Sequence, residues 1–314
     1  MSSVPTSAAP ARPRNTVWLR IKKCKYLYLL FFPVVVYYLM FAYAPMFGLV
    51  IAFKDYNVFK GIAASPWVGF KFFIQFFESK FFFRLIRNTF LISFYGLIFG
   101  FPAPILLALL INELKDGLFK RVVQTVSYLP HFISTVVLVS MYVQFLSVNN
   151  GLINNIVELL GGTRTYFLGD PRYFRTLYTA MGIWRGVGWG SIVYLAALTG
   201  ISPELYEACL IDGGGRLRQT WHITLPGISN TIIIMLIFRV GELLSVGSET
   251  ILLMYNEAIY ETADVISTYV YRRGMINAEY SFGAAVGLFN SLIGLVLVAS
   301  TNQLARRFSE TSLW

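Results

Sequence analysis

Charged side chains within two long apolar stretches are the residues of this sequence best placed to do chemistry. Arg185 lies in the middle of GIWRGVGWG, and Arg239 and Glu242 lie three positions apart in FRVGELLSVG. A charge at the centre of a membrane-spanning helix costs about 2.5–3.5 kcal/mol, so each needs a partner, water or a ligand. Arg239 and Glu242 share one helix face and could neutralise each other, while Arg185 could bond a backbone carbonyl or Glu242. The other interpretation is that all three face a polar path for a solute.

Aromatic and amide side chains accompany these charges on the same stretches and on the last one. Small-ligand sites combine apolar and aromatic walls with a few placed polar groups, which suits the apolar face and the hydroxyls of a sugar ring. We therefore predict a translocation path along the fourth, fifth and sixth spans defined below. Its predicted residues are Arg185, Trp184, Trp189, Tyr194, Arg239, Glu242, Phe289 and Asn290.

The residue patterns of common enzymes are absent from the sequence. It contains no G-x-x-x-x-G-K-[ST] phosphate-binding loop, no H-E-x-x-H and no G-x-S-x-G. His131 and His222 are its two histidines, and they lie far apart without ligand partners nearby. The triple glycine Gly213–Gly215 follows no strand and precedes no lysine, so it is interpreted as a flexible joint. We predict no catalytic residue, metal, cofactor or nucleic-acid partner for this chain, and the energy for transport has to come from another protein.

The composition is that of a polytopic membrane protein. Hydrophobic residues make up 56% of the chain and charged residues 13%, and the mean hydropathy is +0.61. Several apolar runs exceed the roughly 20 residues that a helix needs to cross a bilayer. We predict an all-α fold with six membrane-spanning helices: Tyr26–Phe53, Asn88–Ile111, Val122–Leu146 (interrupted by Pro130), Phe174–Leu198, Gly227–Val246 and Ser281–Thr301.

Basic residues ahead of the first span determine the predicted orientation. Positive charges that flank the first helix usually stay in the cytoplasm, and this chain has six: Arg12, Arg14, Arg20, Lys22, Lys23 and Lys25. Six spans then place both termini in the cytoplasm, with segments 54–87, 148–173 and 247–280 outside. The predicted division is a basic tail over 1–25, one permease domain over 26–307 and a short tail over 308–314. The acidic residues of the last outer segment are interpreted as a solvated face or as a contact for a binding protein: Glu257, Glu261 and Asp264.

The inner segment Ser202–Pro226, SPELYEACLIDGGGRLRQTWHITLP, has the features of a small folded unit. Ser202 is predicted to cap a short helix, with Pro203 in the first turn and Glu204 complementing the helix dipole. Three residues would form its apolar face: Leu205, Ala208 and Cys209. A helix this short is marginal alone, so a docking partner is expected.

The same segment resembles the EAA loop of ABC importer permeases. The positions that carry the resemblance are Glu207, Ala208, Asp212, Gly213, Ile223, Leu225 and Pro226, whereas Cys209 and Gly214 stand where alanine is common in the family. The resemblance implies a coupling helix that sits in a groove of a cytoplasmic ATPase, with Glu207 as anchor and Gly213 as hinge. The residues expected to take part in this coupling are Glu204, Glu207, Ala208, Asp212, Gly213, Leu225 and Pro226.

The resemblance extends over Tyr26–Arg307 and is strongest to the carbohydrate-uptake branch of the family. YLPHFIS (Tyr128–Ser134) and the RRF tail are similar to oligo- and polysaccharide importers, among them the alginate importer permeases. It implies a multi-pass protein of the bacterial cytoplasmic membrane that works by alternating access. The implied partners are a second, non-identical permease, an ATPase dimer that holds ATP and Mg, an extracytoplasmic sugar-binding protein, the oligosaccharide and membrane lipid.

The charge of the chain bears on the substrate. A net charge of +10 and a pI of about 9.6 favour an anionic oligosaccharide, such as an oligouronate. A neutral oligosaccharide is the alternative within the same class. In another class, an ion-coupled secondary transporter would need carboxylates in broken helices, for which only Glu242 offers itself. A membrane-embedded enzyme would need clustered carboxylates or histidines at the membrane surface, and the sequence has no convincing cluster.

Overall fold

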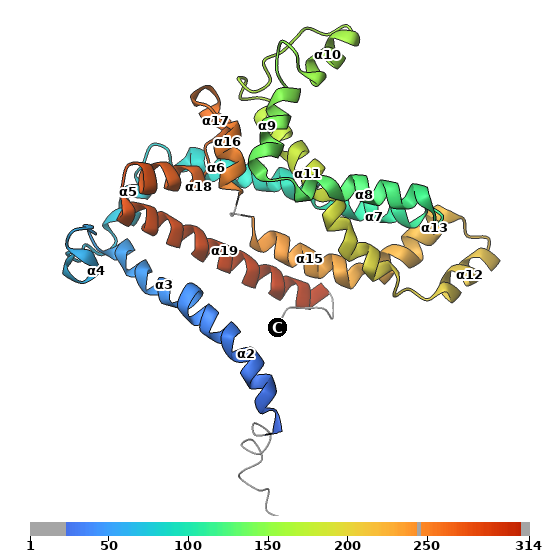
Figure 1. Ribbon diagram of the computed structural model, residues 1–314, viewed down its shortest axis with the longest axis horizontal. Helices are drawn as coiled ribbons and strands as arrows, with labels where there is room; N and C mark the ends of the chain where they lie inside the picture. Colours follow the sequence, from blue (N-terminus) through green and yellow to red (C-terminus); the bar gives the residue numbers. More distant parts are fainter. Residues whose placement is uncertain (1–22, 244–245, 309–314) are drawn as a thin grey trace, which may run out of the picture.

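A computed structural model describes residues 23–243 and 246–308 (Figure 1). In this part of the chain all regular structure is helical, and the one extended pairing is an isolated antiparallel bridge between Lys54 and Trp67. The first half forms α2 (Lys25–Tyr38), η1 (Leu39–Tyr43), α3 (Ala44–Met46), η2 (Phe47–Phe53), α4 (Gly61–Ala64), α5 (Lys71–Phe77), α6 (Phe82–Tyr95), η3 (Gly96–Gly100), α7 (Pro102–Asn112), α8 (Leu118–Phe132), α9 (Thr135–Phe145) and α10 (Leu152–Leu159). The second half forms α11 (Phe174–Leu198), α12 (Pro203–Ile211), α13 (Arg216–Gln219), η4 (Thr220–Thr224), α14 (Leu225–Gly227), α15 (Ser229–Gly241), α16 (Ser248–Met254), η5 (Glu257–Ile259), α17 (Tyr260–Ala263), α18 (Ile266–Val270), η6 (Tyr271–Ile276) and α19 (Tyr280–Phe308).

Neighbouring helices in the bundle come from distant parts of the chain. The long helix α11 packs against α7 and α8, and α19 packs against α15 and η2. Figure 1 shows these helices extending across the view, with α12 at one end of the bundle and α10 projecting away from it. The predicted coupling helix, α12, therefore lies at one end of the long helices rather than among them.

Three helices in the described chain are long and apolar enough to cross a membrane: Lys25–Phe53, Phe82–Asn112 and Tyr280–Gln303. They correspond to the first, second and sixth predicted spans. Two bent helix pairs raise this number to five if each pair counts as one span. α11 has the bounds of the fourth predicted span, and its 25 residues give a length of about 37 Å, but Arg175 and Arg185 make it less apolar. The all-helical membrane fold is confirmed for the described residues, while six spans and cytoplasmic termini stay predictions.

The third predicted span is not one straight helix. The pair Leu118–Phe132 and Thr135–Phe145 is bent by 106°. Pro130, the interruption predicted from the sequence, lies inside α8. The break falls instead at Ile133 and Ser134, whose ψ angles of 136° and 148° are extended, and the Ser134 side chain caps α9. The predicted interruption of Val122–Leu146 is therefore present, but it falls at Ile133 and Ser134 rather than at Pro130.

The fifth predicted span, Gly227–Val246, begins at a bend that separates it from the helical segment before it. Its helical pair, Arg216–Gly227 and Ser229–Gly241, is bent by 62°. Ile228 lies at the break with a φ of −102° and a ψ of 5°, outside the helical region. The helix then ends at Gly241, earlier than predicted.

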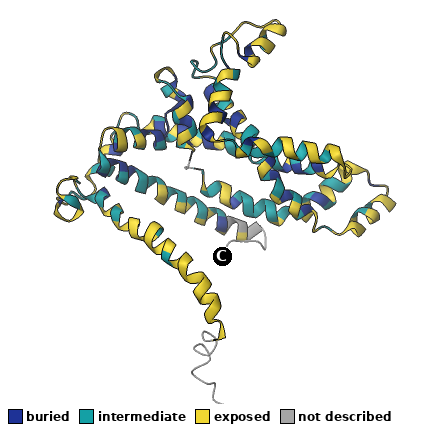
Figure 2. Ribbon diagram, viewed as in Figure 1, coloured by how far each residue is buried: buried dark blue, intermediate teal, exposed yellow. Residues whose placement is uncertain are grey.

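The first span stands apart from the rest of the chain. No residue in its most apolar window is buried, and Figure 2 shows α2 and α3 exposed along almost their whole length. Only η2, at the end of this span, contacts α19 and buries a residue, Ala52. An apolar helix without protein cover has to be covered by lipid or by another subunit.

The outer segments are more folded than the sequence indicates. α6 begins at Phe82, inside the predicted outer loop 54–87, and the preceding α5 buries Phe76. Segment 247–280 forms α16, α17, α18 and η6 and contributes buried residues to two hydrophobic clusters. Both segments therefore pack into the bundle instead of lying over it.

Asp264 is fully buried, so its interpretation as part of a solvated face is wrong. Its carboxylate accepts hydrogen bonds from Arg272 at 2.8 Å and from Arg84 at 3.3 Å. Burial alone lowers the pKa of Arg272, but the hydrogen bond to Asp264 and the charge of that carboxylate outweigh burial, so the net direction is upward. Two cations thus compensate the buried carboxylate, as a stable buried charge requires. Glu257 and Glu261 are exposed, as predicted.

Candidate functional site

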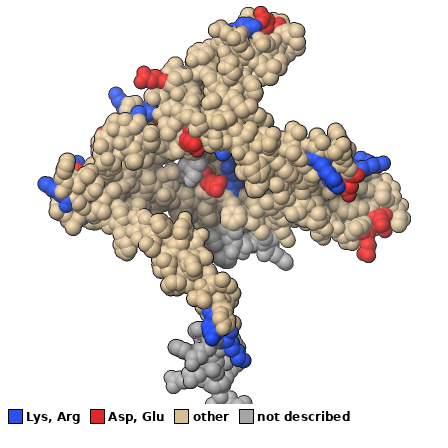
Figure 3. Space-filling model, in the orientation of Figure 1, with Lys and Arg blue, Asp and Glu red and all other residues tan. Residues whose placement is uncertain are grey.

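A cavity of about 630 Å³ lies between η3, α7, α11, α15 and the start of α16. Five of the eight residues predicted for the translocation path line it: Arg185, Trp189, Tyr194, Arg239 and Glu242. Figure 3 shows acidic and basic atoms close together in the hollow near the middle of this face. The structure therefore brings charges from the fourth and fifth predicted spans to one cavity, and their role in transport stays a prediction.

The two arginines of the cavity have no carboxylate partner. Among the ion pairs formed by residues 23–243 and 246–308, none includes Arg185, Arg239 or Glu242. Glu242 follows the last residue of α15, and its backbone N–H still donates to the Phe238 carbonyl at 3.2 Å, so it lies about one turn from Arg239 without forming an ion pair with it. The expected mutual neutralisation by direct contact is therefore not formed, and the cavity has two cations against one carboxylate.

Gly96 makes room for the guanidinium of Arg239. A Cβ atom at position 96 would lie 2.8 Å from Arg239 Nη2, closer than ordinary van der Waals contact. Gly96 begins the π-helical turn η3, on the cavity wall opposite α15. The absence of a side chain at this position therefore allows Arg239 to extend across the cavity.

Three glycines of α11 contribute to the cavity wall beside its larger side chains. Gly182, Gly186 and Gly190 line it at intervals of four residues, so they share one face of the helix. Hydroxyl groups line the cavity as well, and the sequence analysis missed them: Ser93, Thr179 and Thr250. The glycine spacing was a readable signal for a cavity along α11, whereas nothing local marked the three hydroxyls.

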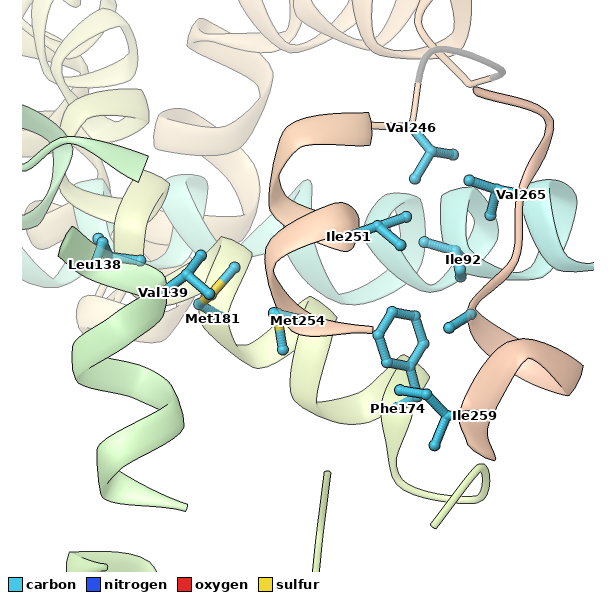
Figure 4. Packing of buried hydrophobic residues seen from close by; sticks show 11 residues of the cluster. Ile92, Leu138, Val139, Phe174, Met181, Val246, Ile251, Met254, Ile259 and Val265 are labelled. Carbon is cyan, nitrogen blue, oxygen red and sulfur yellow. The ribbon is translucent and has the colours of Figure 1, made fainter. Parts of the chain in front are cut away.

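One side of the cavity is closed by buried hydrophobic side chains. Ile92, Met181 and Val246 line the cavity and also belong to the largest buried cluster. Figure 4 shows Ile92 and Val246 facing Ile251 of α16, with Phe174 of α11 close to Ile259. The start of segment 246–265 therefore forms part of the cavity wall.

Three residues predicted for the path are not brought to the cavity by the described structure. Trp184 packs against the hydrophobic cluster, with its ring 6.3 Å from that of Phe145. Phe289 packs against Phe77 of α5 at 5.3 Å, and neither it nor Asn290 lines the cavity. Trp184 faces another element because consecutive residues lie about 100° apart around a helix. Phe289 and Asn290 lie on α19, which contributes none of the lining residues of the cavity.

The predicted coupling helix is confirmed as a helix, α12, although its cap differs from the prediction. Ser202 occupies the N-cap position, but its side chain makes no capping hydrogen bond, so that part of the prediction is wrong. Gly213 ends the unit in the left-handed region, with a φ of 74°, as a glycine after a helix often does. α12 buries no residue against the rest of the chain.

The surface of α12 is the kind that docks on another protein. Leu205 and Leu210 are 53% and 61% exposed, and Glu207 and Ala208 are also exposed. The predicted apolar face of Leu205, Ala208 and Cys209 is therefore not packed within this chain. These exposed apolar side chains leave α12 available to a partner, and its docking on an ATPase stays a prediction.

One hydrogen bond joins the two ends of the coupling segment, and one ion pair connects the segment to the bundle. Thr224 Oγ1 donates to the Gln219 carbonyl at 3.3 Å, so the Tyr206 hydroxyl is the donor in its 3.1 Å bond to Thr224. Arg216 pairs with Glu113 of the preceding inner turn at 3.3 Å. Two coupling residues follow at the entry to the fifth span: Leu225 packs against the buried cluster of α7 and α11, and Pro226 lies in α14.

Comparison with known proteins gives consistent matches over most of the chain. Residues 100–310 match the family described as binding-protein-dependent transport system inner membrane component. The polygalacturonan/rhamnogalacturonan transport system permease protein YteP of Bacillus subtilis (strain 168) is 45% identical over 301 residues, covering 96% of this chain and 94% of the relative. Protein LplB of the same organism is 45% identical over 294 residues, covering 94% of this chain and 92% of the relative.

Solved structures give the same result for the fold. A chain from the crystal structure of a bacterial alginate ABC transporter, in complex with a periplasmic protein that holds an alginate pentasaccharide, superimposes with a TM-score of 0.87. It is 44% identical, and the match covers 95% of this chain and 99% of that one. A second structure, of a bacterial ABC transporter involved in the import of the acidic polysaccharide alginate, gives a TM-score of 0.85 at 45% identity, covering 93% of this chain and 98% of that one.

Proposed function

Because the chain belongs to the family of binding-protein-dependent transport system inner membrane components, we propose that it is the permease subunit of an importer for an acidic oligosaccharide. It moves the sugar across the bacterial cytoplasmic membrane by ATP-driven alternating access. The observation that carries the choice of substrate is a cavity with two unpaired arginines, one glutamate and a partly exposed tryptophan. Membership of the family supports the proposed role in transport.

Electrostatics supports an acidic substrate. A guanidinium and a carboxylate 4 Å apart attract each other by about 4 kcal/mol at an effective dielectric constant of 20. Arg185 and Arg239 offer two such contacts, and Glu242 offsets part of them. Uronate residues carry one carboxylate each, so successive residues of an oligouronate can meet both arginines. The names of two related systems, one for polygalacturonan or rhamnogalacturonan and one for alginate, support the same class of substrate.

The energy for transport comes from a separate ATPase dimer, which holds ATP and Mg. The exposed apolar surface of α12 supports a docking site for that dimer. Glu207 on α12 anchors the contact, and the hydrogen bond from Tyr206 to Thr224 carries the displacement of α12 into the fifth span. The bent start of this span and its charged end at Arg239 and Glu242 then move together with the ATPase.

The working assembly contains a second, non-identical permease and an extracytoplasmic sugar-binding protein. Arg239 and Glu242 are exposed on the open side of the cavity, which supports closure of the path by the second permease. The exposed first span supplies further surface for that partner or for lipid. In this arrangement the chain has six spans with both termini in the cytoplasm, and the binding protein delivers the sugar from outside.

Uptake measurements test the proposed substrate class. The complete transporter, reconstituted in liposomes with its ATPase and binding protein, is supplied with acidic and neutral oligosaccharides of equal length. The proposal predicts transport of galacturonate or alginate oligosaccharides and little transport of neutral glucans. Preference for the neutral sugars would overturn the acidic substrate and favour the alternative of a neutral-oligosaccharide importer.

A further inference from the structure

Trp189 is one of two large aromatic side chains of the cavity that are exposed, the other being Phe238 at 53%. Trp189 lines the cavity and is 45% exposed, whereas Tyr194 is only 4% exposed. An indole ring with a free face can bury the apolar side of a sugar ring. What holds this ring in place is therefore important for the substrate.

The indole of Trp189 is stacked on the imidazole of His131. The two rings are parallel within 1°, and their centroids are 4.5 Å apart. This is the closest ring pair in the described structure, at the short end of the distances over which aromatic rings attract each other. The imidazole therefore covers one face of the indole.

The opposite face of Trp189 is left free by the neighbouring Phe132. The Phe132 centroid lies 5.5 Å from that of Trp189 and 5.7 Å from that of His131. A ring on the far side of the indole would lie about 10 Å from the imidazole, which is the sum of the two distances to the indole. Phe132 therefore lies beside the stacked pair, and a single face of Trp189 remains available.

The backbone positions that bring these rings together are fixed by a glycine. A Cβ atom at Gly188 would lie 2.0 Å from the carbonyl oxygen of Ser127, so α8 and α11 touch through their backbones at this point. His131 follows Ser127 by one helical turn of α8, and Trp189 follows Gly188 directly. The close contact thus sets the register in which the imidazole covers the indole. His131 also lies in the last turn of α8, just before its 106° bend.

We propose that His131 is a positioning residue that holds Trp189 as a one-sided stacking platform for a pyranose ring of the transported sugar. The inference rests on the proposed function, because it needs an oligosaccharide in the cavity. It assigns a role to His131, which lies behind the cavity wall and is not among its lining residues. The stack acts through ring contact, so an aromatic replacement for the imidazole has to preserve it.

The test measures sugar moved per ATP hydrolysed by the reconstituted transporter at saturating binding protein. An aromatic pair contributes about 0.5–1.5 kcal/mol in double-mutant cycles, which corresponds to about a 2- to 12-fold effect. His131→Ala is expected to lower the sugar-to-ATP ratio within that range, with the ATPase rate unchanged. His131→Phe is expected to keep the ratio near the wild-type value. Phe59→Ala, at an aromatic side chain that is 99% exposed and does not line the cavity, is the control and leaves the ratio unchanged.

A double-mutant cycle separates positioning from a structural role. In the Trp189→Ala background, His131→Ala is expected to have no further effect on the ratio. A full additional loss there, or equal losses for His131→Phe and His131→Ala, would overturn the inference. A second readout needs no substrate: in the transporter labelled with 5-fluorotryptophan, the fluorine resonance lost in Trp189→Phe is expected to shift in His131→Ala. An unchanged resonance would also overturn it.

The cycle is measured with whichever pentasaccharide the wild-type transporter takes up fastest, alginate pentasaccharide or a neutral glucan. A pyranose ring of either kind has an apolar face for the indole. A preference for the neutral sugar therefore rejects the acidic substrate of the proposed function while the cycle still decides the role of His131.

Discussion

Replacing Gly96 with alanine perturbs the guanidinium of Arg239 without changing the arginine itself. The added Cβ would lie 2.8 Å from Arg239 Nη2, so the guanidinium has to withdraw by about 0.7 Å to reach ordinary contact at about 3.5 Å. The atom that yields is the end of a flexible side chain, so the stability of the bundle is expected to change little. The substitution therefore acts on the cavity rather than on the fold.

The magnitude follows from Coulomb's law. A sugar carboxylate 4 Å from the guanidinium loses about 0.6 kcal/mol if the distance grows by about 0.7 Å at an effective dielectric constant of 20. This corresponds to about a threefold lower occupancy of the site by an acidic sugar. A neutral sugar has no charge to lose, so its transport is expected to stay near the wild-type level.

The matched control is Gly100→Ala. Gly100 ends the same π-helical turn and lines the same cavity, but a Cβ atom there meets nothing within 4 Å. The assay is the initial uptake rate of alginate pentasaccharide at sub-saturating concentration, with the solubilised complex checked for assembly. Equal rates for the two alanine variants would refute the reasoning that Arg239 reaches across the cavity to Gly96.

Three further substitutions test other parts of the structure. Glu207→Lys reverses a charge on exposed α12 and is expected to abolish substrate-stimulated ATPase activity and uptake; full activity of both would exclude α12 as the ATPase contact. Gly188→Ala places a Cβ atom 2.0 Å from a backbone carbonyl of α8, so it is expected to destabilise the subunit by about 1–3 kcal/mol, measured as a lower thermal midpoint; an unchanged midpoint would contradict the close contact. Ala278→Gly relieves a φ of 56° and is expected to raise the midpoint, by about 0.5–1 kcal/mol of stability; a lower midpoint would contradict the strain.

The sequence predicted those elements whose signal is local. α11 has the predicted bounds, Phe174–Leu198, although Arg175 and Arg185 interrupt its apolar sequence. The coupling helix α12 was also predictable, since Pro203 and the glycines after Asp212 mark its ends. The resemblance to importer permeases rested on the same segment, and the family is confirmed.

The bends and the outer segments could not be predicted because tertiary packing determines them. Pro130 is the local breaker of the third span, yet the helix continues past it and breaks at Ile133 and Ser134. Asp264 reads as a surface residue of an outer loop, but Arg84 and Arg272 from distant positions compensate its burial. The sequence around Asp264 does not show which arginines will lie next to its carboxylate in the folded chain.

For the cavity, too, the sequence predicted some lining residues from local features and missed contacts that depend on the packing of distant helices. The cost of a charge in an apolar stretch pointed to Arg185 and Arg239, and both line the cavity. Trp184 was assigned from its proximity to Arg185 along the chain, which does not determine the face that a helix presents to its neighbours. Phe289 was assigned from its place on the sixth predicted span, but α19 contributes none of the lining residues of the cavity. The sequence did not indicate that His131 stacks on Trp189, because this contact depends on how α8 and α11 are aligned along each other.

The central claim is that Arg185 and Arg239 select an acidic sugar in this cavity, and the ratio of acidic to neutral uptake tests it most directly. Initial rates are measured for alginate pentasaccharide and for a neutral pentasaccharide, in the wild type and in the double variant Arg185→Gln and Arg239→Gln. The account predicts that the wild type favours the acidic sugar and that the double substitution lowers the ratio by about tenfold or more, a loss of at least about 1.4 kcal/mol. An unchanged ratio in a correctly assembled double variant would contradict it.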